Sequence, residues 1–168
     1  MSSEHRRVEL DVADYVRRSQ SGPCFICKVV DGTHEFPHGE IYRDDFAIAF
    51  LNRFPTLLGY ALLAPLEHRV SVVDDFTEDD HVRIQRLVHR VGRAITATVQ
   101  TERLYVMSLG SNQGNAHVHW HLAPLPPGVP YERQQFASLM IESGGYLDLS
   151  ADEHDDLAAR IRAALIAR

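Results

Sequence analysis

The stretch His117-Val118-His119-Trp120-His121-Leu122-Ala123 alternates imidazoles with large apolar side chains. Because successive side chains of a β-strand point to opposite faces, this period of two predicts a strand over residues 117–124. The three histidines would share one face, while Val118, Trp120 and Leu122 would face the core. Neutral imidazole is a nucleophile, a general base and a metal ligand near neutral pH. The histidine face is therefore the candidate functional site, with a merely exposed polar face as the alternative.

Four further strands are expected in segments that are apolar or aromatic and bounded by turn residues. They cover residues 39–43, 46–52, 60–64 and 103–109. A long helix is expected after Thr77, because an acidic first turn follows this residue and apolar residues then recur at helical spacing. A capping box at Ser150-Ala151-Asp152-Glu153 predicts a C-terminal helix, and a shorter helix is expected over residues 12–18.

The size of the chain fits one domain. Its 168 residues, 45% of them hydrophobic, are enough for one core and too few for two comfortable ones. The order of elements predicts an α+β domain with a mainly antiparallel five-stranded sheet, one long helix and a C-terminal helix. Residues 1–23 are expected to form an N-terminal extension, and residues 24–130 the main domain. Residues 131–168 are expected to be a linker and a helix packed on that same domain.

Charge and hydropathy narrow the choice of partners. The formal net charge of -6 argues against a nucleic-acid-binding surface, since such affinity comes chiefly from Lys and Arg that neutralise phosphates. A small-molecule partner is expected instead. No apolar stretch approaches the roughly 20 residues that span a bilayer, and no apolar segment follows the polar amino terminus. We therefore expect no membrane association and a cytoplasmic location.

The alternating histidines resemble the motif of the histidine triad family, whose members are nucleotide hydrolases and nucleotidyl transferases that attack an α-phosphate. Three other segments are similar to that family in order and spacing. They are Cys24-Phe25-Ile26-Cys27-Lys28, residues 41–52 and Pro65-Leu66-Glu67-His68. The resemblance covers about residues 24–124. It implies the HIT-like α+β fold, a small nucleotide substrate, and a homodimer in which two sheets join across a two-fold axis.

The resemblance also implies the roles of the catalytic residues. His119 would attack the α-phosphate of a nucleoside phosphoramidate or dinucleoside polyphosphate and form a nucleotidyl-histidine intermediate. His121 would hydrogen-bond the phosphate oxygens. Asn52 lies in Leu51-Asn52-Arg53-Phe54-Pro55, which is similar to the fragile-histidine-triad branch, and would contact the ribose. A turn-initiating role for Asn52 is compatible with that contact. Tyr60 departs from the branch, which has His there.

The loop before the triad departs from the family pattern. Gln113, Gly114 and Asn115 are candidate binders of phosphate oxygens, because a glycine-containing loop can turn its N–H groups inward. Many relatives carry a Ser or Thr hydroxyl in this loop that assists the leaving group, and this chain has none at the matching place. A side-chain amide donates a hydrogen bond but no labile proton. We expect slow turnover or a different leaving group; a loop whose amides only satisfy the turn is the alternative.

A second set of residues matches, position by position, the zinc ligands of bacterial relatives that keep both cysteines: Cys24, Cys27, His68 and His117. Two thiolates and two imidazoles suit a closed tetrahedral zinc site with a structural role. Zinc is thus the expected cofactor, and the chemistry itself needs none. A disulfide or two buried thiols are the alternatives. The remaining histidines are expected on the surface or on helix faces; they are His5, His34, His38, His81, His89 and His154.

Two other functions stay open at this stage. In one, His117, His119 and His121 together bind a catalytic zinc ion in a metal hydrolase, although three histidines on one short strand converge poorly on a tetrahedron. In the other, the chain is a non-catalytic nucleotide sensor or interaction module, as the missing hydroxyl allows. The sequence does not select the substrate, the leaving group or the base.

Overall fold

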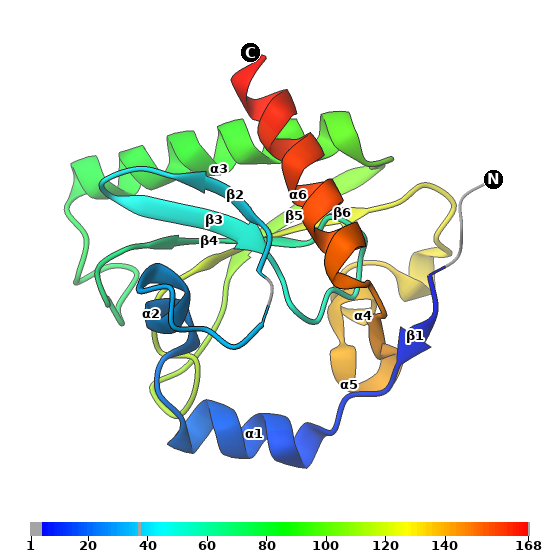
Figure 1. Cartoon of the computed structure of the whole chain (residues 1–168), viewed down its shortest axis with the longest axis horizontal. Coiled ribbons are helices and arrows are strands. Elements are labelled where there is room, and N and C mark those ends of the chain that lie inside the picture. The colour runs from blue at the N-terminus through cyan, green and yellow to red at the C-terminus, as the bar shows by residue number, and fades with distance from the viewer. Residues whose placement is uncertain (1–4, 37, 168) are drawn as a thin grey trace.

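The computed structural model describes residues 5–36 and 38–167, and places a five-stranded sheet between helices (Figure 1). A second, two-stranded sheet pairs Arg7–Val8, near the start of the described chain, with Tyr146–Leu147, ahead of the C-terminal helix. The elements in chain order are β1 (Arg7–Val8), α1 (Val12–Ser21), α2 (Phe25–Val30), β2 (Glu40–Arg43), β3 (Ala47–Leu51), β4 (Ala61–Pro65), α3 (Glu78–Thr98), β5 (Arg103–Ser108), β6 (Trp120–Leu125), η1 (Tyr131–Arg133), α4 (Phe136–Leu139), α5 (Ile141–Gly144), β7 (Tyr146–Leu147) and α6 (Ala151–Ile166).

The sheet has the strand order β2-β3-β4-β6-β5, and every neighbouring pair is antiparallel. The strand β3 is buried throughout, and its side chains alternate between two apolar clusters. Ala49 and Leu51 pack with α3 and α6, whereas Ile48 and Phe50 pack on the α2 side. The predicted α+β class, with five strands, a long helix and a C-terminal helix, is confirmed.

The long helix α3 begins where its cap was expected. Thr77 and Asp80 form a capping box, and the apolar stripe of the helix packs on the sheet beside Trp120. Gly92 permits this close packing, because a Cβ there would lie 2.7 Å from the Leu104 side chain of β5. The helix α6 likewise begins at the predicted capping box of Ser150 and Glu153.

The strand predicted over residues 117–124 is shorter in the structure, because β6 begins only at Trp120. The ladder between β4 and β6 ends at the pair Leu63–Trp120. Pro65 terminates β4 and has no N–H to extend that ladder. The N–H of Val118 instead donates to the carbonyl of Arg69 at 2.7 Å. His117 and His119 therefore lie in an extended segment just before the strand, yet Val118, Trp120 and Leu122 still share the core face as predicted.

The chain outside the main sheet is more structured than the sequence predicts. The helix expected over residues 12–18 continues to Ser21 and ends at Gly22. The segment expected to be a linker, residues 131–149, contains η1, α4, α5 and β7, and β7 pairs with β1. In Figure 1, α1 runs below the sheet, on the side away from α3. Of the helices described, none combines the length and the hydropathy that a membrane span requires.

Candidate active site and metal-ligand cluster

His119 is held in one tautomer by the backbone. Its Nδ1 donates to the carbonyl oxygen of His117 at 2.8 Å, so Nε2 is the unprotonated nitrogen of the neutral ring. The residue is 4% exposed. Burial lowers the pKa of His119, and this effect is larger than the opposite effect of the hydrogen bond to His117. Phe25 of α2 contacts the ring edge to face, with centroids 5.9 Å apart. The result is a neutral imidazole with a free lone pair, which is the form a nucleophile needs.

His121 lies beside His119, with ring centroids 4.6 Å apart. Burial first, and then the neighbouring His119, lower the pKa of His121 to about 3. Its Nδ1 is 2.9 Å from the hydroxyl of Tyr60, the residue just before β4. The neutral ring of His121 can therefore donate one hydrogen bond to a substrate oxygen when the tyrosine hydroxyl donates to Nδ1.

The structure brings the four predicted metal ligands together. One ligand atom each from Cys24, Cys27, His68 and His117 lies within 4.8 Å of the other three. Nε2 of His117 donates to the Pro65 carbonyl at 2.9 Å, which turns Nδ1 toward the two thiols at 3.5 and 3.6 Å. Burial lowers the pKa of His117 to about 4, so the ring is neutral, as a ligand must be. This donor set is compatible with zinc.

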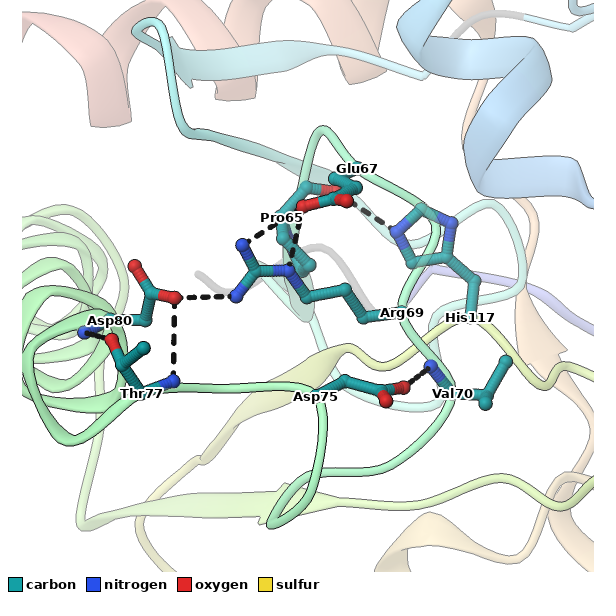
Figure 2. Close-up of polar contacts among 8 residues, drawn as sticks. All are labelled: Pro65, Glu67, Arg69, Val70, Asp75, Thr77, Asp80 and His117. Atoms are coloured by element: carbon teal, nitrogen blue, oxygen red, sulfur yellow. Dashed lines mark hydrogen bonds and ion pairs between the residues drawn. The ribbon is translucent and has the colours of Figure 1, made fainter.

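Arg69 follows His68 in the chain and fixes this loop through ion pairs with Glu67 and Asp80, which Figure 2 shows. The guanidinium donates to Asp80 at the start of α3 at 2.8 Å and to Glu67 at 2.9 Å, and it lies over the Phe76 ring. Asp80 is itself a member of the α3 capping box. The long helix thus anchors the segment from Pro65 to Arg69. This segment carries His68, one residue of the cluster, and the Pro65 carbonyl, which accepts from His117.

Among the described residues, His119 and His121 do not belong to any such group of ligands. The structure therefore gives no support to the alternative in which all three triad histidines bind one catalytic zinc ion. The His117 ring is directed away from the other two triad histidines. It faces the thiols, whereas the rings of His119 and His121 lie beside each other.

The loop before the triad closes on itself. The N–H of Gly114 donates to the Ser111 carbonyl, and the N–H of Gln113 donates to the Ser111 hydroxyl. Asn115 adopts a left-handed conformation, with φ of 56°, and its side-chain amide donates to the Tyr15 hydroxyl of α1 at 3.0 Å. The Gly114 amide is thus engaged within the turn, and phosphate binding by these three residues stays a prediction.

Asn52 ends β3 and begins a turn. Its Oδ1 accepts from the N–H of Phe54 at 3.0 Å, and its carbonyl accepts from Nε2 of His154 at 3.3 Å. His154, which was expected on the surface or on a helix face, lies in the first turns of α6 and is buried, with 6% of the residue exposed. The turn-initiating role of Asn52 is thereby observed, and a contact with ribose stays a prediction.

Three residues around the triad were not found from the sequence. Ser108 donates its hydroxyl proton to the His119 carbonyl at 2.8 Å, Phe25 packs on the His119 ring, and Tyr15 contacts the loop before the triad. Each comes from a different element, so no local spacing connects them to the motif. Only the Cys-x-x-Cys segment that contains Phe25 signalled a nearby functional role.

The α+β domain thus carries two neighbouring, neutral histidines, His119 and His121, and a cluster of two thiols and two imidazoles. The family's model, the HIT domain, matches residues 33–127, which is more than half of the chain. The protein belongs to the HIT family. The family identification made from the motifs is thus confirmed.

Individual relatives agree with this assignment. The chain is 24% identical over 142 residues to an uncharacterized HIT-like protein of Borreliella burgdorferi, covering 82% of this chain and 95% of that one. It is 30% identical over 106 residues to the adenosine 5′-monophosphoramidase of Schizosaccharomyces pombe, covering 61% and 74%. A zinc-bound histidine triad protein of Mycobacterium smegmatis superposes with a TM-score of 0.64 at 21% identity, covering 86% and 94%. Together, family and relatives support a nucleotide hydrolase or transferase activity in general.

Proposed function

We propose that the protein hydrolyses or transfers the nucleotidyl group of a nucleoside phosphoramidate or dinucleoside polyphosphate, with His119 as nucleophile and His121 as a phosphate-binding residue. The observation that carries the proposal is the fixed tautomer of His119, whose Nδ1–H is bonded to the His117 carbonyl. Nε2 is then available to attack the α-phosphate without losing a proton first. The phosphoramidase activity of the fission yeast relative supports the same substrate class.

The test measures turnover of a panel of nucleoside phosphoramidates and dinucleoside polyphosphates. In the same reactions, nucleotidyl label bound to the protein is measured after a rapid quench, and its acid-labile and acid-resistant fractions are separated. An enzyme of this class releases the nucleoside monophosphate and carries an acid-labile nucleotidyl label during turnover. A chain that binds AMP tightly, but forms no label and turns over none of the panel, would instead be the non-catalytic nucleotide-binding module.

We further propose that Cys24, Cys27, His68 and His117 hold a structural zinc ion. The donor set itself supports this fit, because two thiols and two neutral imidazoles suit tetrahedral zinc and leave no open position for substrate. Burial, and then the adjacent Cys24, raise the pKa of Cys27 to about 11, a value that a bound cation would reverse. The ion would tie α2 to the triad segment, and no chemical step needs it.

We also propose a homodimer formed through β5. This strand is the last in the sheet, so one side of its backbone has no partner strand within the sheet. Val106 on β5 is 45% exposed, and a surface hollow of about 620 Å³ beside it is lined by exposed Tyr131 and Phe136. A second copy would cover these apolar groups and extend the sheet across a two-fold axis.

A further inference from the structure

The helix α1 faces the candidate site with one side. None of its residues is fully buried, and Tyr15 and Ser19, four positions apart on one helix face, are the partly buried ones that touch the loop before the triad. Ser19 lies against Gly114: a Cβ built on this glycine would be 3.4 Å from the Cβ of Ser19. The Tyr15 hydroxyl is 3.0 Å from Nδ2 of Asn115. The extension therefore forms part of the wall around the triad.

The hydrogen bond between Asn115 and Tyr15 does not involve the hydroxyl proton of Tyr15. Nδ2 of Asn115 has only protons to offer, so the tyrosine oxygen accepts and its O–H remains free to donate to another acceptor. The described contacts assign no acceptor to that proton. The O–H of this half-buried tyrosine is therefore available to an acceptor on a bound ligand.

Tyr15 contacts one residue next to Asn52 in the turn after β3 and one residue of the loop before the triad. Its ring meets Phe54 edge to face with centroids 6.4 Å apart, and Phe54 donates its N–H to Asn52 on the proposed ribose side. Asn115, which the Tyr15 hydroxyl contacts, lies close to the proposed nucleophile: a Cβ built on Gly110 would be 2.6 Å from the Asn115 carbonyl oxygen and 4.0 Å from Cε1 of His119. A phosphate bonded to Nε2 of His119 would therefore form near the loop residue that the Tyr15 hydroxyl contacts.

We propose that Tyr15 is a catalytic residue, whose hydroxyl donates its proton to the leaving group of the nucleotide substrate. This inference rests on the proposed function. It answers a need that Gln113, Gly114 and Asn115 cannot meet, because the two side-chain amides carry no labile proton and Gly114 has no side chain. The acid would thus come from the N-terminal helix rather than from the triad loop.

Nε2 of His119 uses its lone pair to bond phosphorus, the bond from phosphorus to the leaving nitrogen or oxygen breaks toward that atom, and Tyr15 gives it a proton. The phosphorylated ring carries a positive charge, and the phenolate accepts the Asn115 hydrogen bond. In the second step water attacks phosphorus, the bond to Nε2 breaks, and the proton of water returns to the phenolate of Tyr15. Both side chains end as they began.

The test compares Tyr15→Phe with wild type on two substrates that differ only in the leaving group. Adenosine 5′-phosphoramidate must protonate its nitrogen to expel ammonia, whereas the 4-nitrophenyl ester of AMP expels a stable phenolate without an acid. We expect Tyr15→Phe to lower kcat on the phosphoramidate by about 10²-fold and on the ester by less than about threefold. The ring remains against Phe54, so the variant should keep its melting temperature. Val16→Ala, the neighbouring exposed position on α1, is the matched control and should match wild type.

The other outcomes overturn either the inference about Tyr15 alone or the proposed function as well. Equal losses on both substrates would mean that Tyr15 only shapes the site, and full activity on both would mean that it does nothing there; either overturns the inference alone. A wild type that cleaves the ester but not the phosphoramidate has no leaving-group acid, which also overturns it. A wild type that cleaves neither substrate overturns the proposed function, and the inference with it.

Discussion

The carbonyl of His117 accepts the Nδ1 proton of His119, while the imidazole of His117 itself faces the thiols of Cys24 and Cys27. One residue thus belongs to two sites through different atoms. Its side chain joins the metal-ligand cluster, and its backbone sets the tautomer of the proposed nucleophile. Because a short backbone segment is shared, loosening of the fold around the cluster is expected to reach the proposed nucleophile as well.

His119→Ala removes the nucleophile but leaves the rest of the site in place. We expect turnover to fall by several powers of ten, while the affinity for AMP changes little, since only the atom that forms the covalent bond is lost. His119→Gly should behave in the same way. Steady-state kinetics and calorimetric AMP binding measure the two quantities. A variant that retains half of the wild-type activity rules out His119 as the nucleophile.

Asn52→Ala is expected to weaken nucleotide binding by about 1 kcal/mol, or about fivefold, as for one lost hydrogen bond to ribose. A 2′,3′-dideoxynucleotide lacks the ribose hydroxyls and should bind the wild type more weakly than the parent nucleotide does. In Asn52→Ala the same change of nucleotide should cause little further loss, because the hydrogen bond is already absent. Asn52→Asp is the matched control, because its carboxylate still accepts from Phe54 N–H and from a ribose hydroxyl. Full addition of the two losses would show that Asn52 does not touch the sugar.

Much of this architecture could be predicted because short-range patterns determine it. The alternation of His119, Trp120, His121 and Leu122 predicted the two faces of the segment, and the capping boxes predicted where both long helices begin. The start of β6 could not be predicted, since it depends on Pro65, a residue of the partner strand that cannot extend the ladder.

The role of α1 was hidden for a different reason. The helix carries no buried apolar stripe, so nothing in its sequence indicates what it packs against; its link to the site is one tyrosine hydroxyl and one serine contact. The burial of His154 on its helix was also not indicated by the sequence, because a lone histidine in a polar first turn resembles an exposed residue. Its burial arises from contact with Asn52, which is distant in sequence.

Asp80 is expected to make folding stability depend on acid pH. The hydrogen bond from Arg69 holds the pKa of this carboxyl below its ordinary value of about 4. The stabilisation is therefore complete above the ordinary pKa and disappears as the pH falls through the lower, folded-state pKa. Melting temperature measured between about pH 2 and 6 should fall more steeply for wild type than for Asp80→Asn. Asp79→Asn, an exposed neighbour in the same turn, should keep the wild-type slope; equal slopes in all three proteins contradict the prediction.

Val106→Arg tests the dimer through β5. A charged side chain at this partly exposed edge position should be tolerated in a single chain but not when it is covered by a second copy. Light scattering after size exclusion should give twice the chain mass for wild type and the chain mass of 19.0 kDa for the variant. Val73→Arg, on an 80% exposed loop residue, is the control and should stay dimeric. A monomeric wild type would show that the protein forms no dimer. A dimeric Val106→Arg would show that the interface does not involve this part of β5.

The metal-ligand cluster yields the last prediction. The purified protein should contain about one zinc ion per chain, and Cys24→Ser should lower both the zinc content and the melting temperature, because binding energy of such a site contributes to folding. Since the thiols must lose their protons to bind, the same chelator concentration should remove more metal as the pH falls. Activity should decline only as the fold loosens, because His119 and His121 lie outside the cluster among the described residues. Val30→Ala in α2, near the cluster but without a ligand atom, is the control for a general effect on that helix. A Cys24→Ser/Cys27→Ser variant that keeps its zinc would show that the ligands lie elsewhere in the protein.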